Sequence, residues 1–169
     1  MRKIIKAIDS VSNASGHVVL VLCYGLIGVV VYSVFMRYVV NQPPMWTYDT
    51  SVMIGGAMYM LAWSYTQFHK GHVRVDVFYI HFSPRIKSII DVLGTLIFFL
   101  PLFTMLIWTA YKYAYRAWAT KERFLETYWY PPAAPIRTLV VIGLCLFLLQ
   151  MLAQFVRDFY VMVKGKPYD

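Results

Sequence analysis

The sequence predicts an all-α integral membrane protein with four transmembrane helices, an N-terminal interfacial amphipathic helix and both termini in the cytoplasm. Of its 169 residues, 60% are hydrophobic and only 14% are charged, and the mean hydropathy is +0.56. A soluble domain of this size cannot bury so much apolar surface. Four stretches contain no Asp, Glu, Lys or Arg, and each has roughly the 20 residues that a helix needs to cross a hydrocarbon core. They are Ser10–Met36, Thr50–Phe68, Val92–Tyr111 and Thr138–Val156.

These stretches leave few residues for anything else, so we expect one membrane domain over residues 1–169. The expected spans cover about residues 17–40, 48–68, 86–112 and 136–158. An even number of spans places both termini on one side. Ten of the 16 lysines and arginines fall on that side and six on the other. The bias of basic residues toward the cytoplasm therefore predicts cytoplasmic termini.

The first 15 residues have an apolar stripe at helical spacing, formed by Ile4, Ile5, Ile8 and Val11, with basic residues around it. This pattern is typical of an interfacial helix lying on the cytoplasmic face, although a frayed tail would also fit it. The apolar run that follows is too long for the core of a signal peptide. We therefore expect the first span to be retained.

Two connections are expected on the outer side. The first is a tight turn over residues 41–44, because prolines disfavour helix there, and it is followed by aromatic residues at headgroup level. The second connection combines aromatic rings with charges. Its candidate docking residues are Trp118, Glu122, Glu126, Tyr128, Trp129 and Tyr130. An aromatic belt and a docking surface for a partner both fit this composition.

Inside the membrane, helices associate through small and polar side chains. Ser51 and Gly55 lie on one face of the second span, where they would allow close approach. Gln150 and Gln154 lie on one face of the fourth span, and two amides in hydrocarbon require partners. Those partners lie either in another span of this chain or in a second polypeptide. Pro101, in the middle of the third span, predicts a kink.

The chemistry expected of a catalyst or a proton relay is missing from the spans, since no span interior contains a carboxylate or an amine. Cys23 and Cys145 are far from any metal-binding spacing, and three of the four histidines lie in or beside one loop, which disfavours haem. The net charge of +8 is placed beside the spans, where it suits lipid headgroups rather than nucleic acid. We therefore expect no catalytic residues, no metal and no cofactor, and membrane lipids as partners.

The densest polar cluster lies in the cytoplasmic loop over residues 69–78. Gly71 suits the turn that ends the second span, and Ser83-Pro84 suits the start of the third helix. Arg74 and Asp76 are expected to make specific polar contacts there.

One series of positions extends from the first span to the last. It consists of Arg37-Tyr38, a proline-containing turn, Trp46, an acidic position at Asp49, Gly71-His72-Val73-Arg74-Val75-Asp76, Ser83-Pro84 and Tyr130-Pro131-Pro132. In this order, these positions resemble the small membrane subunit of tripartite ATP-independent periplasmic (TRAP) transporters. The resemblance covers nearly the whole chain, and its most specific part is the string Gly-His-Val-Arg-Val-Asp.

The resemblance implies a non-catalytic subunit in the bacterial inner (cytoplasmic) membrane. Such subunits scaffold a large multispanning membrane subunit, which holds the sodium and substrate sites and moves like an elevator. They also help to dock a periplasmic substrate-binding protein that usually delivers an organic acid. One departure is visible: the family commonly has two adjacent carboxylates after the tryptophan, whereas this chain has Tyr48-Asp49.

We therefore expect the partner interface to draw on residues from the outer ends of the first two spans, the cytoplasmic loop and the fourth span. The candidates are Arg37, Trp46, Asp49, Ser51, Gly55, Gly71, His72, Arg74, Asp76, Gln150 and Gln154. The alternative function is a membrane-anchor subunit of a respiratory or redox complex, and a third hypothesis is a free-standing exporter.

Overall fold

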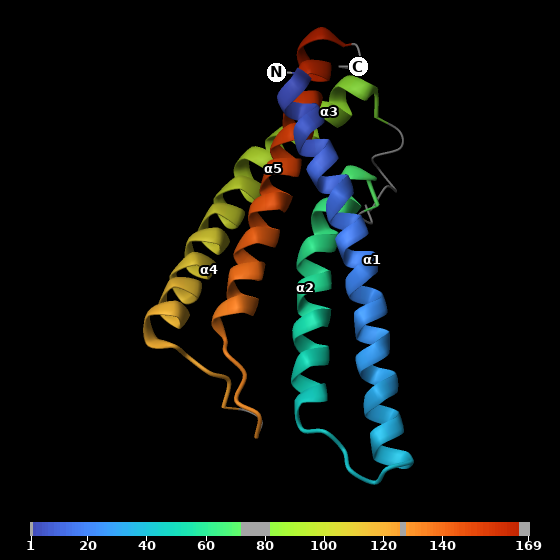
Figure 1. The fold of residues 1–169 in the computed structure, drawn as a ribbon. Helices are drawn as coiled ribbons and strands as arrows, with labels where there is room; N and C mark the ends of the chain where they lie inside the picture. Colours follow the sequence, from blue (N-terminus) through green and yellow to red (C-terminus); the bar gives the residue numbers. More distant parts are fainter. Residues whose placement is uncertain (1, 72–81, 126–127, 166–169) are drawn as a thin grey trace.

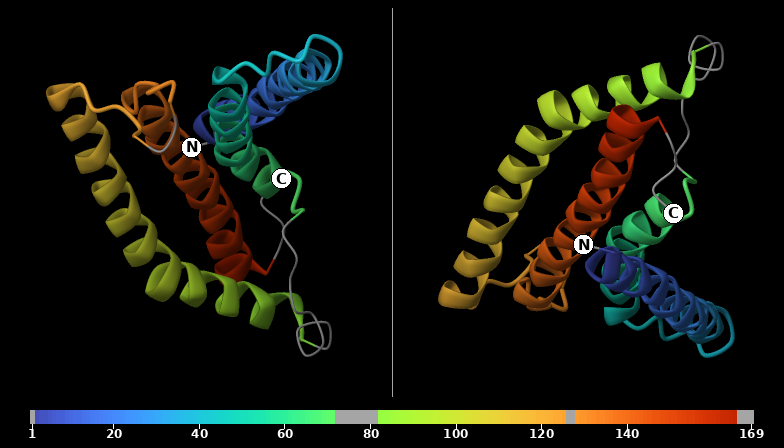
Figure 2. Two further views of the ribbon diagram at one scale, coloured as in Figure 1. Left: turned by 90° about the horizontal axis from the view of Figure 1, so that it is seen from below. Right: turned by 90° about the horizontal axis from the view of Figure 1, so that it is seen from above.

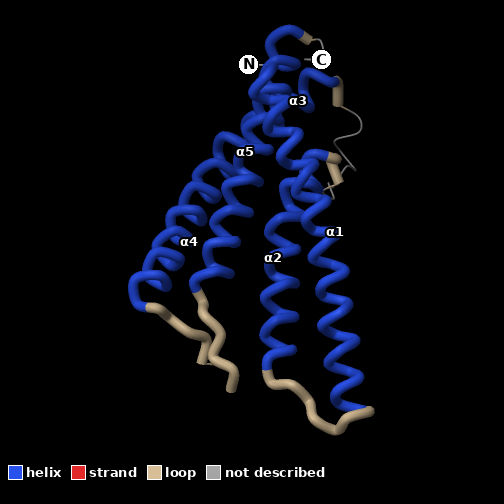
Figure 3. The backbone as a smooth tube through the Cα atoms, viewed as in Figure 1, coloured by secondary structure: helices blue, strands red, loops and turns tan. Residues whose placement is uncertain are grey.

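The computed structural model describes residues 2–71, 82–125 and 128–165, and every regular element within them is a helix (Figures 1 and 3). The long helices lie in the order α4, α5, α2, α1, approximately in one layer (Figure 2). Contacts agree with this order, because α2 packs against α1 and α5, and α5 packs against α4. Two helical hairpins, α1–α2 and α4–α5, diverge from the end at which both termini lie (Figure 1).

Helix α1 runs without a break from Arg2 to Tyr38, a length of 37 residues. The segment expected to form a separate interfacial helix is therefore the first part of this long helix. No proline interrupts the chain between Arg2 and Tyr38, and the side chains of Ile5, Ser12 and Ser15 are buried. The N-terminal segment thus presents one face to neighbouring helices.

A short turn that contains Pro43 and Pro44 leads into α2, Trp46–Phe68, as the sequence predicts. The predicted turn at the end of this helix is also present, but its left-handed residue is Lys70 (φ 54°) rather than Gly71. The amide of Gly71 donates to Thr66 O at 2.9 Å and that of Lys70 to Gln67 O at 3.1 Å. These two bonds form a Schellman motif.

The third predicted span consists of α3, Pro84–Gly94, a π-helical turn, Thr95–Phe99, and α4, Leu100–Thr120. Ser83 caps the N-terminus of α3 by accepting from the Ile86 amide, which confirms the predicted helix start. The π-helical turn ends two residues before Pro101, whose ring would clash with the carbonyl four residues earlier in a regular helix. The helical path bends there, which confirms the predicted kink (Figure 2).

Helix α5, Ala134–Lys164, is the central element, because α1, α2, α3 and α4 all contact it. It approaches α2 closely at Gly143. A Cβ atom added there would lie 2.7 Å from the Met60 Cβ and 2.8 Å from the Met60 carbonyl oxygen. By contrast, no atom lies within 4 Å of such a Cβ at Gly55, where the sequence predicted close approach.

Three helical segments of the described chain are long and apolar enough to cross a membrane: Arg2–Tyr38, Arg85–Thr120 and Ala134–Lys164. They include the first, third and fourth predicted spans. Helix α2 is the remaining long helix, and its 23 residues would also reach across a bilayer. It is not among the three segments that meet the criterion, and it carries Asp49, Gln67 and several hydroxyl-bearing residues. The four-span topology and the cytoplasmic position of the termini remain predictions.

Gly143→Ala is expected to destabilise the fold by about 2 kcal/mol or more, because the added methyl group meets the Met60 backbone, which cannot move independently of α2. Gly28→Ala is the matched control, since no atom lies within 4 Å of its Cβ position. This control should be neutral or stabilising by up to about 1 kcal/mol. Unfolding in micelles, followed by circular dichroism, measures both, and equal effects would contradict the close contact.

Candidate functional site

A buried polar network joins α1, α2 and α5. The Ser12 hydroxyl donates to Gln150 Oε1 at 2.7 Å and lies 2.7 Å from the Ser64 hydroxyl oxygen. The single proton of Ser64 is then available to Ser12 Oγ, and the Leu146 carbonyl oxygen, 3.3 Å from Ser64 Oγ, is a second and more distant acceptor for the same proton. The exposed fractions of Ser12, Ser64 and Gln150 are only 1%, 0% and 1%. These three side chains therefore bond to one another rather than to surroundings outside the chain.

The network continues toward the end of the molecule at which the termini lie. The Gln150 amide nitrogen donates to Asp9 Oδ1 at 3.1 Å, and Arg157 forms an ion pair with the other Asp9 oxygen. Each oxygen of this carboxylate thus has a donor from α5. The N-terminal part of α1 is held against α5 by a charge-assisted hydrogen bond as well as by neutral ones.

This geometry satisfies the polar groups of Gln150 within the chain, which is one of the two alternatives that the sequence left open. Gln154 donates to Asp158 Oδ1 on its own helix at 2.9 Å. Among the described residues, no buried side-chain nitrogen or oxygen atom lacks a hydrogen-bond partner. The hydrogen bonding of Gln150 therefore needs no second polypeptide.

The α1 half of this network was not predicted from the sequence. Asp9, Ser12 and Ser15 recur at intervals of three residues, so they lie on one face of a helix. This polar stripe could have been recognised in the sequence. The apolar stripe of the same segment instead predicts an interfacial helix. The partners on α2 and α5 could not be identified from spacing, because their alignment depends on tertiary packing.

At the opposite end of the molecule, a second polar contact joins the start of α5 to the connection that precedes it. Arg137 donates from Nη1 and Nη2 to the two carboxylate oxygens of Glu122, at 2.7 and 2.8 Å. The amide of Ala133 donates to Glu122 O, and that of Phe124 donates to Pro131 O. Hydrogen bonds therefore hold together the two ends of the α4–α5 connection. These hydrogen-bonded ends are the base of the connection.

The pKa of Glu122 is lowered from its ordinary value of 4.5. The hydrogen bond from Arg137 is the main cause, and the charges of Arg137 and Arg116 also lower this pKa, whereas burial acts in the opposite direction. The carboxyl group therefore stays ionised to more acidic pH in the folded chain than in the unfolded chain.

The predicted docking residues lie around this base. Trp118 donates from Nε1 to the Thr138 hydroxyl at 2.9 Å while most of its ring is exposed. Tyr128 is 83% exposed, and Trp129 and Tyr130 are also exposed. Tyr130 has a φ of 52°, which is uncommon for an aromatic residue. Glu126 lies outside the described residues.

Four of the partner-interface candidates lie where the short turn joins α1 to α2. Arg37 and Ser51 line a cavity of about 300 Å³ between these helices. Asp49 lies in the first turn of α2, where the helix dipole favours a carboxylate. The ring of Trp46 stacks on Tyr32, with 5.8 Å between centroids. Of the loop candidates, Gly71 belongs to the turn after α2, whereas His72, Arg74 and Asp76 lie outside the described residues.

The buried polar side chains Ser12, Ser15, Ser64 and Gln150 all form hydrogen bonds between helices. No group of three or more His, Cys, Asp and Glu side chains in the described part of the chain could hold a metal ion. The hydroxyl of Ser33 lies 3.0 Å from that of Thr47, which adds a polar contact between α1 and α2. The arrangement can fix helices relative to one another and present exposed aromatic and apolar surface.

Comparison with known families identifies one match. Residues 26–160 match the family described as "Tripartite ATP-independent periplasmic transporters, DctQ component". This match covers the four long helices, except for the N-terminal part of α1 and the last residues of α5. No curated protein matches the chain significantly.

Ser12→Ala is expected to lower the free energy of unfolding by about 1–3 kcal/mol, because it leaves the buried Gln150 carbonyl without its donor. Ser51→Ala is the matched control, since the Ser51 hydroxyl donates to Thr47 O on the same helix. Its effect should stay within about 0.5 kcal/mol. Denaturation in micelles measures both, and two equally small effects would remove the network from the forces that hold the helices together.

The pair formed by Glu122 and Arg137 predicts a pH dependence. Because the pKa of Glu122 is lower in the folded chain, its contribution to stability is present above pH 4.5 and is lost as the pH falls through the folded pKa. A carbon-13 titration of the Glu122 side chain should show a midpoint below 4.5. Arg137→Gln should return the midpoint toward 4.5, and an unchanged midpoint would contradict the assigned cause.

Proposed function

Because the chain belongs to the DctQ component family of tripartite ATP-independent periplasmic transporters, we propose that it is the stationary scaffold of its complex. As the small membrane component of such a transporter, it would hold the fixed part of a large multispanning subunit. The transport domain of that subunit could then move against it. The complex would lie in the bacterial inner membrane.

The observation that carries this proposal is the internal closure of the polar network. Gln150, Ser12 and Ser64 use their hydrogen-bonding groups on one another, and Asp9 is held by Gln150 and Arg157. Breaking such contacts inside hydrocarbon leaves polar groups without partners, which is costly. Helices joined in this way are suited to remain fixed while a neighbouring subunit moves.

The single-layer arrangement supports the scaffold role further. A layer one helix thick has two broad faces, and large apolar side chains are exposed along α1 and α4. Val21 on α1 and Met105 on α4 are 67% and 70% exposed. Apolar surface of this extent is typical of contact with lipid or with another membrane subunit.

The α4–α5 connection is the proposed docking element for a periplasmic substrate-binding protein. It combines a base fixed by the Glu122–Arg137 pair with exposed aromatic rings at Tyr128 and Trp129. Exposed aromatic residues on an ordered support are the kind of surface that contributes strongly to protein binding. Sodium coupling and organic-acid substrates are also part of the proposal, and they rest on the resemblance of the sequence to TRAP small subunits.

The family match gives no support to the alternative of a membrane anchor for a redox complex. The match names a transporter component. The proposal therefore stays with a transport complex whose substrate and ion sites lie in another subunit.

Reconstitution in proteoliposomes tests the proposal. Sodium-driven uptake of an organic acid is expected only when this chain, its large subunit and its binding protein are all present. Replacing both Tyr128 and Trp129 by alanine should lower uptake about tenfold, with assembly of the two membrane subunits unchanged. Phe159→Ala, an exposed aromatic residue near the opposite end of α5, is the matched control.

Two outcomes would contradict this account. Uptake by this chain alone would place the transport site in the chain itself. Equal uptake by the double variant and by the control would show that the α4–α5 connection does not dock the binding protein. The scaffold role would still be tested by whether uptake requires all three components.

A further inference from the structure

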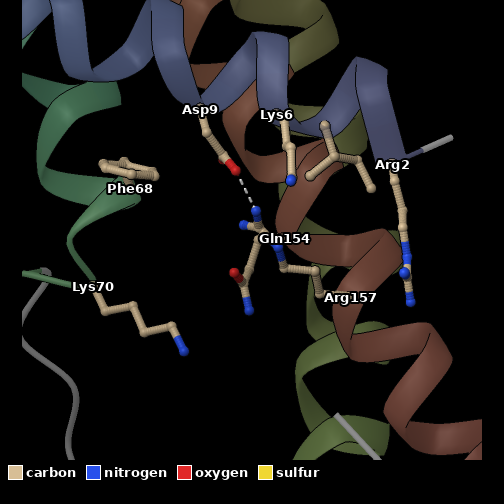
Figure 4. A pocket seen from close by; sticks show the side chains of 8 residues that line it. Arg2, Lys6, Asp9, Phe68, Lys70, Gln154 and Arg157 are labelled. Atoms are coloured by element: carbon tan, nitrogen blue, oxygen red, sulfur yellow. Dashed lines mark hydrogen bonds and ion pairs between the residues drawn. The ribbon is translucent and has the colours of Figure 1, made fainter. Parts of the chain in front are cut away.

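A basic cavity of about 490 Å³ opens near the end of the molecule at which the termini lie (Figure 4). It lies between the first turns of α1, the end of α2 and the C-terminal half of α5. Its lining residues are Arg2, Ile5, Lys6, Asp9, Phe68, Lys70, Gln154 and Arg157. Figure 4 shows Lys6, Lys70 and Gln154 arranged around the Asp9–Arg157 ion pair.

The charge of this basic cavity is strongly positive. Four cationic side chains line it, against a single carboxylate. That carboxylate, Asp9, already accepts from Gln150 and Arg157. Like charges gathered around one space repel one another, and an anion relieves that repulsion. The cavity therefore fits an anionic group, with the Gln154 amide as a further hydrogen-bond donor or acceptor.

An apolar groove lies between α1 and α5, and the buried side chain of Ile5 lines both this groove and the basic cavity. The groove has a volume of about 180 Å³. Its lining residues are Ile4, Ile5, Ile8, Leu152, Ala153 and Val156. The two spaces together offer a cationic compartment next to an aliphatic one. A small soluble anion would use only the first, whereas an amphipathic anion would use both.

The position of the cavity along α1 agrees with an amphipathic ligand. The charged residues at this end of α1 stop at Asp9, and the next charge is Arg37. At 1.5 Å per residue, the uncharged stretch between them spans about 40 Å, enough to cross a hydrocarbon core. The first turns of α1, which line the cavity, then lie at the level of the lipid headgroups.

We propose that this cavity binds the phosphate of an anionic phospholipid, with one acyl chain in the apolar groove. Lys6 of α1 and Lys70, just after α2, bind the phosphodiester from two sides, and Gln154 of α5 offers a polar contact between them. The lipid thereby links the α1–α2 hairpin to α5 at the end where the hairpins converge. A free phosphate offers the same anionic chemistry to the cavity but has no group for the groove.

Native mass spectrometry of the full chain, released from micelles that contain phosphatidylglycerol or phosphatidylcholine, tests the proposal. The wild-type chain is expected to retain phosphatidylglycerol selectively. Replacing Lys6 and Lys70 together by glutamine should weaken that retention about 30-fold, since each lysine near an anionic headgroup contributes about fivefold. The double variant Lys3→Gln, Lys164→Gln is the matched control, because it removes the same charge from the same end outside the cavity.

A second measurement needs no variant. Dioleoyl phosphatidylglycerol should raise the unfolding temperature of the wild-type chain more than glycerol phosphate or inorganic phosphate does at equal concentration. Equal stabilisation by inorganic phosphate would overturn the lipid assignment in favour of a free-phosphate site. Equal retention of both lipids, or equal loss in the two double variants, would overturn the proposal. None of these outcomes bears on whether the chain scaffolds a transporter.

Discussion

The Gln150 side chain fixes how three helices of this protein meet. Its amide is 1% exposed within α5, so both of its polar atoms need partners from the chain itself. Ser12 and Asp9 on α1 supply them, and Ser64 on α2 bonds to the same serine. A different relative placement of α1 and α5 would leave these groups unpaired in a medium without water. The close approach of α2 and α5 at Gly143 adds a steric constraint to the polar one.

The arrangement of the helices in a single layer determines how much surface is open to lipid and to other subunits. A closed bundle hides most of its side chains, whereas a layer leaves two faces for lipid and for other subunits (Figure 2). The most deeply buried polar side chains of the described residues, Ser12, Ser64 and Gln150, bond between helices, and many large apolar and aromatic side chains are exposed. Such a division suits a protein whose role in transport is to hold a larger neighbour in place.

The helical architecture could be predicted from the sequence because length, apolar runs and prolines act locally. The Ser83 cap, the turn after α2 and the kink before Pro101 follow from such local rules. The left-handed residue at Lys70 and the continuity of α1 were not predicted, because neighbouring contacts decide them. The Glu122–Arg137 pair and the α1 half of the buried network also depend on tertiary alignment, which residue spacing within one helix does not encode.

The central claim is that this chain stays fixed while its partner moves. Double electron–electron resonance tests it with spin labels at Val21→Cys and Met105→Cys, after Cys23 and Cys145 have been replaced by serine. The measurement uses the assembled transporter in nanodiscs, with and without sodium and substrate. The distance distribution between the two labels should remain the same in every condition. A shift of more than about 2 Å between conditions would show that the helices rearrange during transport and would contradict the stationary frame.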